Sequence, residues 1–333
     1  MTIRPFTLDL DRPLSTASGT IDARKGFLFG RDGGVGEATP LPGWTEAADD
    51  CGDALRAADA ADDWGSALAA CADAPAARHG VSVANLDARA RADGEPLAAV
   101  LADGAEYADA VPVNATVGDA DVEATRSAVA DAADAGFEAV KVKVGARPIE
   151  DDLARLRAAS DAADVSLRAD ANGAWSAKQA REAADDLAAL DLEYVEQPLP
   201  AASLDGYGSL DGVPVALDEG LVHHDLGDVL DVADYVVLKP MALGGVDRAR
   251  DAAMAAREAG VDPVVSTTID AVVARTAAVH LAATIPDVRA CGLATADLLA
   301  NDLAVDPAPV EGGRIVVPDT PGHGVDVEVG TDA

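Results

Sequence analysis

The stretch Val140-Lys141-Val142-Lys143-Val144 decides the fold of this chain. Its lysines alternate with valines, so on a β-strand both ammonium groups leave one face while the valines fill the other. Four more short apolar runs follow, and each ends on a charged residue: Asp170, Glu196, Asp218 and Lys239. Counted from Lys143, the successive intervals are 27, 26, 22 and 21 residues. Each interval fits one strand plus one helix, which indicates a β/α barrel with its chemistry at the C-terminal strand ends.

This repeat occupies the middle of the chain. We expect eight strands, the first near 111–116 and the last two at 263–268 and 288–293. The expected helices lie at about 121–135, 147–163, 176–189, 202–209, 224–232, 246–259 and 269–284. Asp121 and Ser176 stand where helix N-caps are expected. The sequence therefore predicts an α/β fold, a modified TIM (β/α) barrel at 109–301.

The residues on either side of the repeat follow other patterns. From about Glu46 to Leu101 the sequence is helical and Ala-rich, with interruptions expected at Trp64-Gly65 and His79-Gly80. Before it, antiparallel strands are expected at 7–10, 26–30 and 35–38. We therefore predict an N-terminal α+β capping domain at 1–108. A strand-like run at 312–318 lies outside the repeat, so we expect the C-terminal segment, 302–333, to return to the capping domain and complete it.

The net charge of −34 is the strongest feature of the composition. A chain this acidic repels phosphates, which excludes nucleic acid as a partner. No run approaches 18 apolar residues and the start lacks an export signal, so we expect a cytoplasmic protein without a membrane partner. The acidity is spread over helix faces, which resembles proteins kept soluble in a salt-rich cytoplasm, as in halophiles. Cys51, Cys71 and Cys291 lack metal spacing and are expected to be buried thiols.

Lysine is rare in this chain and is therefore informative. Only five lysines occur, against twenty arginines, and Lys141, Lys143 and Lys239 lie at predicted strand ends. Arginine cannot act as a base at neutral pH, whereas a lysine that is desolvated beside other cations can. These three lysines are therefore candidates for proton transfer.

Asp170, Glu196 and Asp218 end three successive predicted strands, so their carboxylates are expected to converge on one side of the barrel mouth. Carboxylates brought together without a cation repel one another, and a hard divalent cation removes that cost. None of the five histidines has a partner at ligand spacing. The all-oxygen set predicts Mg²⁺ or Mn²⁺ in preference to Zn²⁺.

Lys143 and Lys239 are expected to face each other across the mouth, with the metal between them. This arrangement suits removal of a proton α to a carboxylate, because one lysine can take the proton while the cation stabilises the enediolate. The other lysine lies on the opposite face. A lysine or histidine base with Mg²⁺ at an ene-diolate is the pattern of the enolase superfamily.

The motifs resemble the muconate-lactonizing branch of that superfamily over essentially the whole chain. They are Lys141-Val142-Lys143, Asp170-Ala171-Asn172, Glu196-Gln197-Pro198, Asp218-Glu219 and Lys239-Pro240. Ser18-Gly19-Thr20 and the run at 36–43 resemble the capping-domain loops that close over the substrate. The Pro-Leu-Pro-Gly loop, Ser266-Thr267-Thr268 and the stretch at 291–297 are most similar to the o-succinylbenzoate synthases of menaquinone biosynthesis.

The resemblance implies a Mg²⁺-dependent lyase that removes water from a cyclohexadiene carboxylate by syn β-elimination. Lys143 would take the α-proton and help the β-hydroxyl depart, Lys239 would stabilise the opposite face, and Lys141 would tune the pKa of Lys143. The implied metal ligands are Asp170, Glu196 and Asp218, with Asn172 and Glu219 orienting the site around them. The implied substrate contacts are Ser18, Leu41, Pro42, Gly43, Ser266, Thr267 and Thr268.

Two positions depart from the family. Gly220 stands where a serine commonly follows Asp-Glu, which is a small difference. Ile269-Asp270 replaces a common Glu-Ser, which leaves the contacts to the succinyl side of the substrate open. We expect a small-molecule carboxylate as the partner, and the sequence leaves a homo-oligomer open.

The catalytic residues leave other reactions open. A dipeptide epimerase or an N-succinylamino acid racemase would use opposed lysines equally well, and muconate cycloisomerization is a third, weaker alternative. The stretch Leu293-Ala294-Thr295-Ala296 lacks the Asp-x-Asp with which dipeptide epimerases hold the substrate ammonium, which argues against that reaction. A retired barrel acting as a binding or structural subunit is disfavoured, because no lysine or metal ligand of the pattern is missing. Gly244-Gly245 indicates a tight packing turn rather than a phosphate site.

Overall fold

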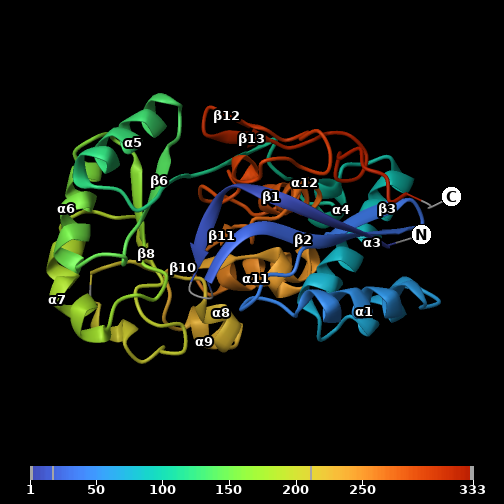
Figure 1. The fold of residues 1–333 in the computed structure, drawn as a ribbon, viewed down its shortest axis with the longest axis horizontal. Coiled ribbons are helices and arrows are strands. Elements are labelled where there is room, and N and C mark those ends of the chain that lie inside the picture. The colour runs from blue at the N-terminus through green and yellow to red at the C-terminus, as the bar shows by residue number, and fades with distance from the viewer. Residues whose placement is uncertain (1–2, 17–18, 211, 331–333) are drawn as a thin grey trace.

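The computed structural model describes residues 3–16, 19–210 and 212–330, and they form two parts that lie side by side (Figure 1). One part is a parallel sheet with helices along its outer face, and the other combines an antiparallel sheet with helices. The modified β/α barrel with an added α+β part that the sequence predicted is therefore confirmed. Within the described residues, no helix is long and apolar enough to cross a membrane.

The antiparallel sheet has the order β1-β2-β3, from β1 (Ile3–Thr16), β2 (Gly19–Arg31) and β3 (Gly34–Ala38). Strands β1 and β2 form a long hairpin that reaches the barrel, where Leu10 bridges Leu299. The turn between β2 and β3 places Asp32 at φ 53° and Gly33 at φ 85°, as the Asp-Gly pair favours. The three antiparallel strands expected from the sequence are present.

Helices pack against this sheet: α1 (Ala48–Asp59), α2 (Trp64–Ala70), α3 (Pro75–Asp93) and α4 (Leu97–Ala102). The break expected at His79-Gly80 is wrong, because α3 runs through it without interruption. The helix packs closely on β3 at this glycine, since a Cβ on Gly80 would lie 3.1 Å from the Ala38 Cβ. The break expected at Trp64-Gly65 falls just earlier, because Trp64 begins α2 behind the N-cap Asp63.

Among the residues that the structure describes, the barrel sheet has seven parallel strands in chain order. They are β5 (Ala115–Val117), β6 (Ala139–Lys143), β7 (Ser166–Asp170), β8 (Tyr194–Glu196), β9 (Val215–Leu217), β10 (Tyr235–Leu238) and β11 (Asp262–Val265). The eighth strand expected at 288–293 is wrong as a full strand. Only single bridges occur there, Gly292 to Ser266 and Cys291 to Val113, and they join both edges of the sheet.

The side chain of Arg168 ties the last segment to the inside of the barrel. The Arg168 guanidinium on β7 donates to the Ala290 carbonyl at 2.6 Å and to Asn114 Oδ1 at 3.1 Å. A buried side chain thus supplies a hydrogen-bond donor to this segment beside its two backbone bridges. Gly292 is also pressed against Ser266, because a Cβ there would lie 2.7 Å from the serine Oγ.

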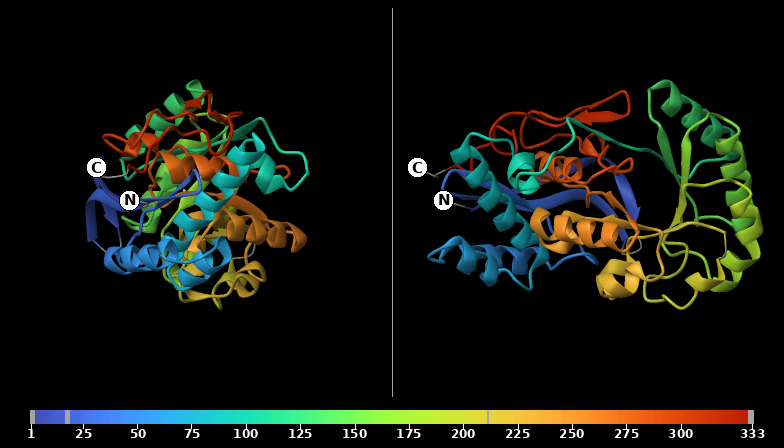
Figure 2. Two further views of the ribbon diagram at one scale, coloured as in Figure 1. Left: turned by 90° about the vertical axis from the view of Figure 1, so that its right-hand side faces the viewer. Right: turned by 180° about the vertical axis from the view of Figure 1, so that it is seen from behind.

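Helices α5 (Val122–Asp134), α6 (Ile149–Ser160) and α7 (Ala177–Ala188) cover the outer face of the sheet (Figures 1 and 2). Asp121 caps α5, and Ser176 caps α7 in a capping box with Gln179, as expected. The helix expected at 202–209 is wrong, because only the 3₁₀ turn Tyr207–Ser209 forms there. The remaining barrel helices are α8 (Gly220–His223), α9 (Leu226–Leu230), α10 (Pro240–Leu243), α11 (Val246–Glu258) and α12 (Val272–Ala283).

The C-terminal segment runs back along the molecule. Strand β13 (Arg314–Val316) pairs with β12 (Val310–Glu311) on one side and with β4 (Ala110–Pro112), just before the barrel sheet, on the other, rather than with β1–β3. Further on, the backbone N–H of His323 donates to Asp87 Oδ1 of α3 at 2.9 Å. The C-terminal segment therefore contacts first the strand that precedes the barrel sheet, and then helix α3 of the capping part.

On the inward-facing side of the barrel strands, a layer of apolar side chains is followed by a layer of polar ones. Tyr194, Ala216, Val237 and Val264 form a small apolar cluster of their own. Two residues further along the same strands or just beyond their ends, and so on the same face, come Glu196, Asp218, Lys239 and Ser266. Strands β8 to β11 thus carry apolar residues inside the barrel and polar ones at its mouth, whereas β7 carries the buried Arg168 beside Tyr194.

Candidate active site

The lysines of β6 and the acids of β7 and β8 meet through strand register. Lys143 is paired with Asp170, and Asp170 with Glu196, along the parallel ladder. Val140 and Val142 are buried, whereas Lys141 and Lys143 are partly exposed, so the alternation predicted from the sequence is confirmed. The functional side chains therefore project from neighbouring C-terminal strand ends.

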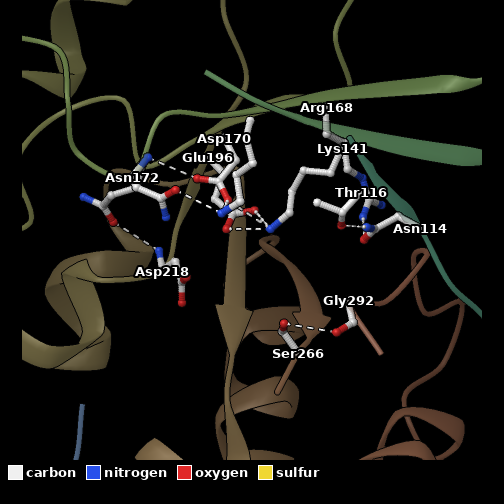
Figure 3. A network of polar contacts seen from close by, with 12 residues as sticks. Asn114, Thr116, Lys141, Arg168, Asp170, Asn172, Glu196, Asp218, Ser266 and Gly292 are labelled. Atoms are coloured by element: carbon white, nitrogen blue, oxygen red, sulfur yellow. Dashed lines mark hydrogen bonds and ion pairs between the residues drawn. The ribbon is translucent and has the colours of Figure 1, made fainter. Parts of the chain in front are cut away.

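One half of the site is built around Lys141 (Figure 3). Its Nζ lies 3.1 Å from Asp170 Oδ2 and 3.1 Å from each carboxylate oxygen of Glu196. Lys143 donates to Asp170 Oδ2 at 2.7 Å and to Asn172 Oδ1 at 2.9 Å. The Lys143 side chain is 37% exposed, against 14% for Lys141. Lys143 is therefore the lysine of this pair that a substrate can reach.

The other half is built around Lys239, which follows β10. Its Nζ donates to Asp218 Oδ2 at 2.5 Å and lies 3.5 Å from the centroid of the Trp44 ring. Between β6 and β10 in the sheet lie β7, β8 and β9, the strands that end on the three acids. Lys143 and Lys239 therefore approach the carboxylates from opposite sides.

The loops at the strand ends are fixed by amides. The Gln197 side-chain oxygen accepts from the backbone N–H groups of Asp218, at 3.2 Å, and Gly220, at 3.0 Å. Asn172 donates from Nδ2 to Glu219 Oε1 at 2.9 Å. Gln197 and Asn172 also have positive φ angles of 39° and 43°, which are costly for residues other than glycine. Side-chain bonds thus hold strained backbone immediately beyond two of the acids.

Burial and charge push the acids' pKa values apart. Burial and then the nearby Asp170 charge raise the pKa of Glu196 to about 8. Burial also raises the pKa of Asp218, to about 6, against the opposing effect of Lys239. For Asp170, burial is outweighed by Lys141 and Lys143, which lower its pKa below the usual range. Such divergence of neighbouring carboxyl groups is typical of catalytic sites.

Asp170, Glu196 and Asp218 offer the oxygen donors that Mg²⁺ prefers. Within the described ranges, no three Asp, Glu, His or Cys side chains stand close enough to hold a metal, and the ammonium groups of Lys141 and Lys239 contact these acids. Asp218 Oδ1 and Glu219 Oε2 are nevertheless buried without a hydrogen-bond partner. Orphaned acceptors are costly unless something fills them, and a hard cation would fit.

The predicted substrate contacts lie in different surroundings. Ser18 lies outside the described residues. Leu41 is buried, whereas Pro42 and Gly43 are exposed on a tight turn closed by Leu41 and Thr45. Ser266 donates to the Gly292 carbonyl at 3.2 Å, and Thr267 contacts Thr295. Thr268 is buried and its hydroxyl is bound to Asp270. Their contacts with substrate stay predictions.

Two functional features were missed by sequence reasoning. Trp44 adjoins the Pro-Leu-Pro-Gly loop, and only that position hinted at a role. Glu37 is completely buried, and its carboxylate accepts from the backbone N–H groups of Ala271 and Ala274 at the start of α12. Glu37 therefore links β3 to the barrel at the start of α12, just after the loop that follows β11.

Comparison with known proteins agrees with this geometry. Residues 124–330 match the family model described as enolase C-terminal domain-like. The chain is 40% identical over 218 residues to the o-succinylbenzoate synthase of Thermobifida fusca, and 37% identical over 223 residues to that of Mycolicibacterium smegmatis. These matches cover 61% and 64% of this chain and 66% and 67% of the relatives, so they span about two thirds of the relatives' length.

A solved structure extends the similarity to nearly the whole chain. It is a dipeptide epimerase from Methylococcus capsulatus complexed with Mg and a dipeptide. That protein is 28% identical, with a TM-score of 0.83 over 97% of this chain and 98% of its own. From the barrel, the residues at its mouth and the matched family model, we conclude that this chain belongs to the enolase C-terminal domain-like family.

Proposed function

We propose that this protein is a lyase that forms o-succinylbenzoate by removing water from 2-succinyl-6-hydroxy-2,4-cyclohexadiene-1-carboxylate. The observation that carries the proposal is the placement of Lys143 and Lys239 on opposite sides of Asp170, Glu196 and Asp218. The o-succinylbenzoate synthases among its relatives support the choice of substrate.

Lys143 is the proposed base, because it is the more exposed lysine of β6. Its Nζ would take the α-proton, and the electron pair of that C–H bond would become the new ring double bond as the β C–O bond breaks. The proton on Lys143 would pass to the departing hydroxyl, which leaves as water. One group acting twice on the same face gives a syn elimination.

The other residues have supporting roles in this proposal. Asp170, Glu196 and Asp218 would hold Mg²⁺, which supplies positive charge to the substrate carboxylate when bound. Lys239 would hold an ammonium on the opposite face, and Lys141 would keep Asp170 and Glu196 in place. Asn172 would orient Lys143, and Glu219 would orient Asn172. The burial of these acids strengthens each of the electrostatic contacts.

The domain division follows from the same reasoning. We propose that residues 1–108 cap the barrel at 109–301, and that residues 302–333 tie the two together. The turn at 41–45 would then close over the mouth together with Ser266, Thr267 and Thr268. Its position beside Lys239, through Trp44, supports this arrangement.

Epimerization of dipeptides or racemization of N-succinylamino acids is the second candidate. The similarity to the Methylococcus capsulatus epimerase and the two opposed lysines favour it. Against it, the residues after the closing bridge are Leu293-Ala294-Thr295-Ala296, which offer no carboxylate to a substrate ammonium.

The test uses purified protein with Mg²⁺ in molar KCl and the cyclohexadiene carboxylate, followed by loss of diene absorbance. The proposal predicts rapid loss that depends on Mg²⁺. Absence of turnover, combined with exchange of the α-proton of dipeptides or N-succinylamino acids in D₂O, would assign the protein to the second candidate. Absence of both reactions would contradict proton abstraction altogether.

A further inference from the structure

The capping part sends an aromatic ring into the barrel mouth. The Trp44 ring lies over the ammonium of Lys239, with 3.5 Å between Nζ and the ring centroid. The Lys239 side chain is only 13% exposed, so water competes little for the charge. A cation over the face of tryptophan at this distance is attracted by the ring, and the attraction grows when both are desolvated.

The turn that carries Trp44 is anchored at both ends. Before it, the buried Arg24 guanidinium donates to the carbonyl oxygens of Thr39, at 2.8 Å, and Pro40, at 3.2 Å. After it, the Glu46 carboxylate accepts from two backbone N–H groups at the start of α3, at 2.9 and 3.0 Å. Within it, the Leu41 carbonyl accepts from the Trp44 N–H at 3.0 Å. These hydrogen bonds fix the backbone of the turn and thereby the position of the Trp44 ring.

Lys239 depends on this ring more than the other two lysines of the mouth depend on any one neighbour. Lys141 is bound to both Asp170 and Glu196, and Lys143 to both Asp170 and Asn172. Across the described ranges, Lys239 has one oxygen partner, Asp218. If Asp218 holds the metal as proposed above, the ring is the contact that keeps the ammonium in place.

We propose that Trp44 is a positioning residue, which holds the Lys239 ammonium on the face of the substrate opposite Lys143. The expected effect of Trp44 on turnover rests on the proposed function, whereas the contact between Trp44 and Lys239 does not. It makes the capping turn part of the catalytic geometry, because loss of the ring would free Lys239 to leave the mouth.

The kinetic test compares three variants in the diene assay. Trp44→Leu is expected to lower kcat about tenfold with little change in KM, because the lost contact acts on the lysine and not on substrate binding. Trp44→Phe keeps an aromatic face and is expected to restore kcat to within about threefold of wild type. Trp64→Leu is the matched control, since Trp64 lies under Arg31 at 5.2 Å, within the capping part. It is expected to leave kcat unchanged.

A second measurement reads the contact without using activity. The protein has three tryptophans, Trp44, Trp64 and Trp175, so 5-fluorotryptophan labelling gives three ¹⁹F resonances that single Trp→Phe variants assign. Lys239→Met removes the charge and is expected to shift the Trp44 resonance while leaving the other two in place. Circular dichroism checks that each variant is folded.

The outcomes separate the two proposals. Equal kcat in Trp44→Leu and wild type, equal losses in Trp44→Leu and Trp44→Phe, or a change in KM alone would overturn the positioning role while the dehydration stands. An unmoved Trp44 resonance in Lys239→Met would overturn the contact. If the wild-type protein does not turn over the diene, the proposed function fails, and the ¹⁹F shift alone decides whether Trp44 holds Lys239.

Discussion

Glu37 and the acids of the barrel mouth are all buried carboxylates, but their hydrogen-bond partners differ in kind. Glu37, where β3 meets α12, accepts from the backbone N–H groups of Ala271 and Ala274 at 2.8 and 2.9 Å and from the Thr39 hydroxyl at 2.5 Å. At the barrel mouth, the acids are instead bound to the ends of long lysine side chains, and Asp218 Oδ1 has no hydrogen-bond partner among the described residues.

The difference lies in what can move. Backbone N–H groups at the start of a helix are fixed, so the Glu37 contacts suit a permanent joint between two parts of the fold. Lysine ammonium groups sit on flexible stems and can exchange partners when a cation or substrate enters. A buried acid satisfied by backbone thus indicates structure, and one satisfied by lysines with spare lone pairs indicates chemistry.

The largest effect is expected from Asp218→Asn at the mouth. Without this carboxylate the proposed metal is held poorly, and kcat should fall by at least about 10²–10³-fold. The metal-free variant should unfold at nearly the same temperature as wild type, because the burial that raises the pKa of Asp218 also makes its charge costly. Thermal unfolding with and without millimolar Mg²⁺ measures both effects. An Mg²⁺-induced stabilisation equal to that of wild type would show that Asp218 is not a ligand.

Glu37→Gln is expected to show the reverse pattern. The amide keeps one acceptor but faces a donor toward backbone N–H groups, so the free energy of unfolding should drop by about 2 kcal/mol. Turnover by the folded protein should stay within about threefold of wild type. Denaturant unfolding and the diene assay test the pair of expectations. A loss of turnover without a loss of stability would contradict the structural role and indicate that Glu37 takes part in the reaction.

The difference in unfolding free energy between wild type and Glu37→Gln is expected to depend on pH. Burial, with the Asp270 charge, raises the pKa of Glu37 from 4.5 to about 7. Between pH 4.5 and about 7, Glu37 is protonated more often in the folded state than in the unfolded state. The stability that Glu37 contributes in its protonated form is therefore lost as pH rises through this range. The stability gap between wild type and Glu37→Gln should therefore narrow by at least about 1 kcal/mol between pH 5 and pH 7.5. A constant gap would contradict this.

The smallest effect is expected from Gly220→Ser, which restores the residue common in the family. A Cβ there meets nothing closer than 3.6 Å, so activity should stay within about twofold and the melting temperature within about 2 °C. The matched change beside Glu37 is Gly36→Ala on the side of β3 that packs on α3, where its Cβ would lie 1.9 Å from the Gly80 carbonyl oxygen. It should cost about 3 kcal/mol. Similar melting temperatures for the two variants would contradict the contrast.

Much of the fold and the composition of the mouth could be predicted because strand alternation is local. Lysines two residues apart on a predicted strand share a face, and the charges at 143, 170, 196, 218 and 239 each follow an apolar run. Caps at Asp121 and Ser176 were equally readable, since a cap bonds to residues three positions away.

Features that depend on distant contacts could not be predicted. Nothing in the sequence links Trp44 to Lys239, 195 positions apart. The glycine at 80 reads as a helix breaker, but its partner is a strand some forty residues earlier. The segment expected as an eighth strand forms only single bridges, and the Arg168 side chain, far away in sequence, donates to its Ala290 carbonyl. Tertiary packing overrides local propensity in each of these places.

The most direct test of the account is the turnover of Lys143→Ala in the diene assay, beside Lys178→Ala as a matched control. Lys178 is 80% exposed on α7 and takes no part in the mouth. The account predicts that Lys143→Ala folds, and that its turnover falls at least about 10³-fold while Lys178→Ala equals wild type. A Lys143→Ala protein with more than about a tenth of wild-type turnover would contradict the assignment of Lys143 as the base.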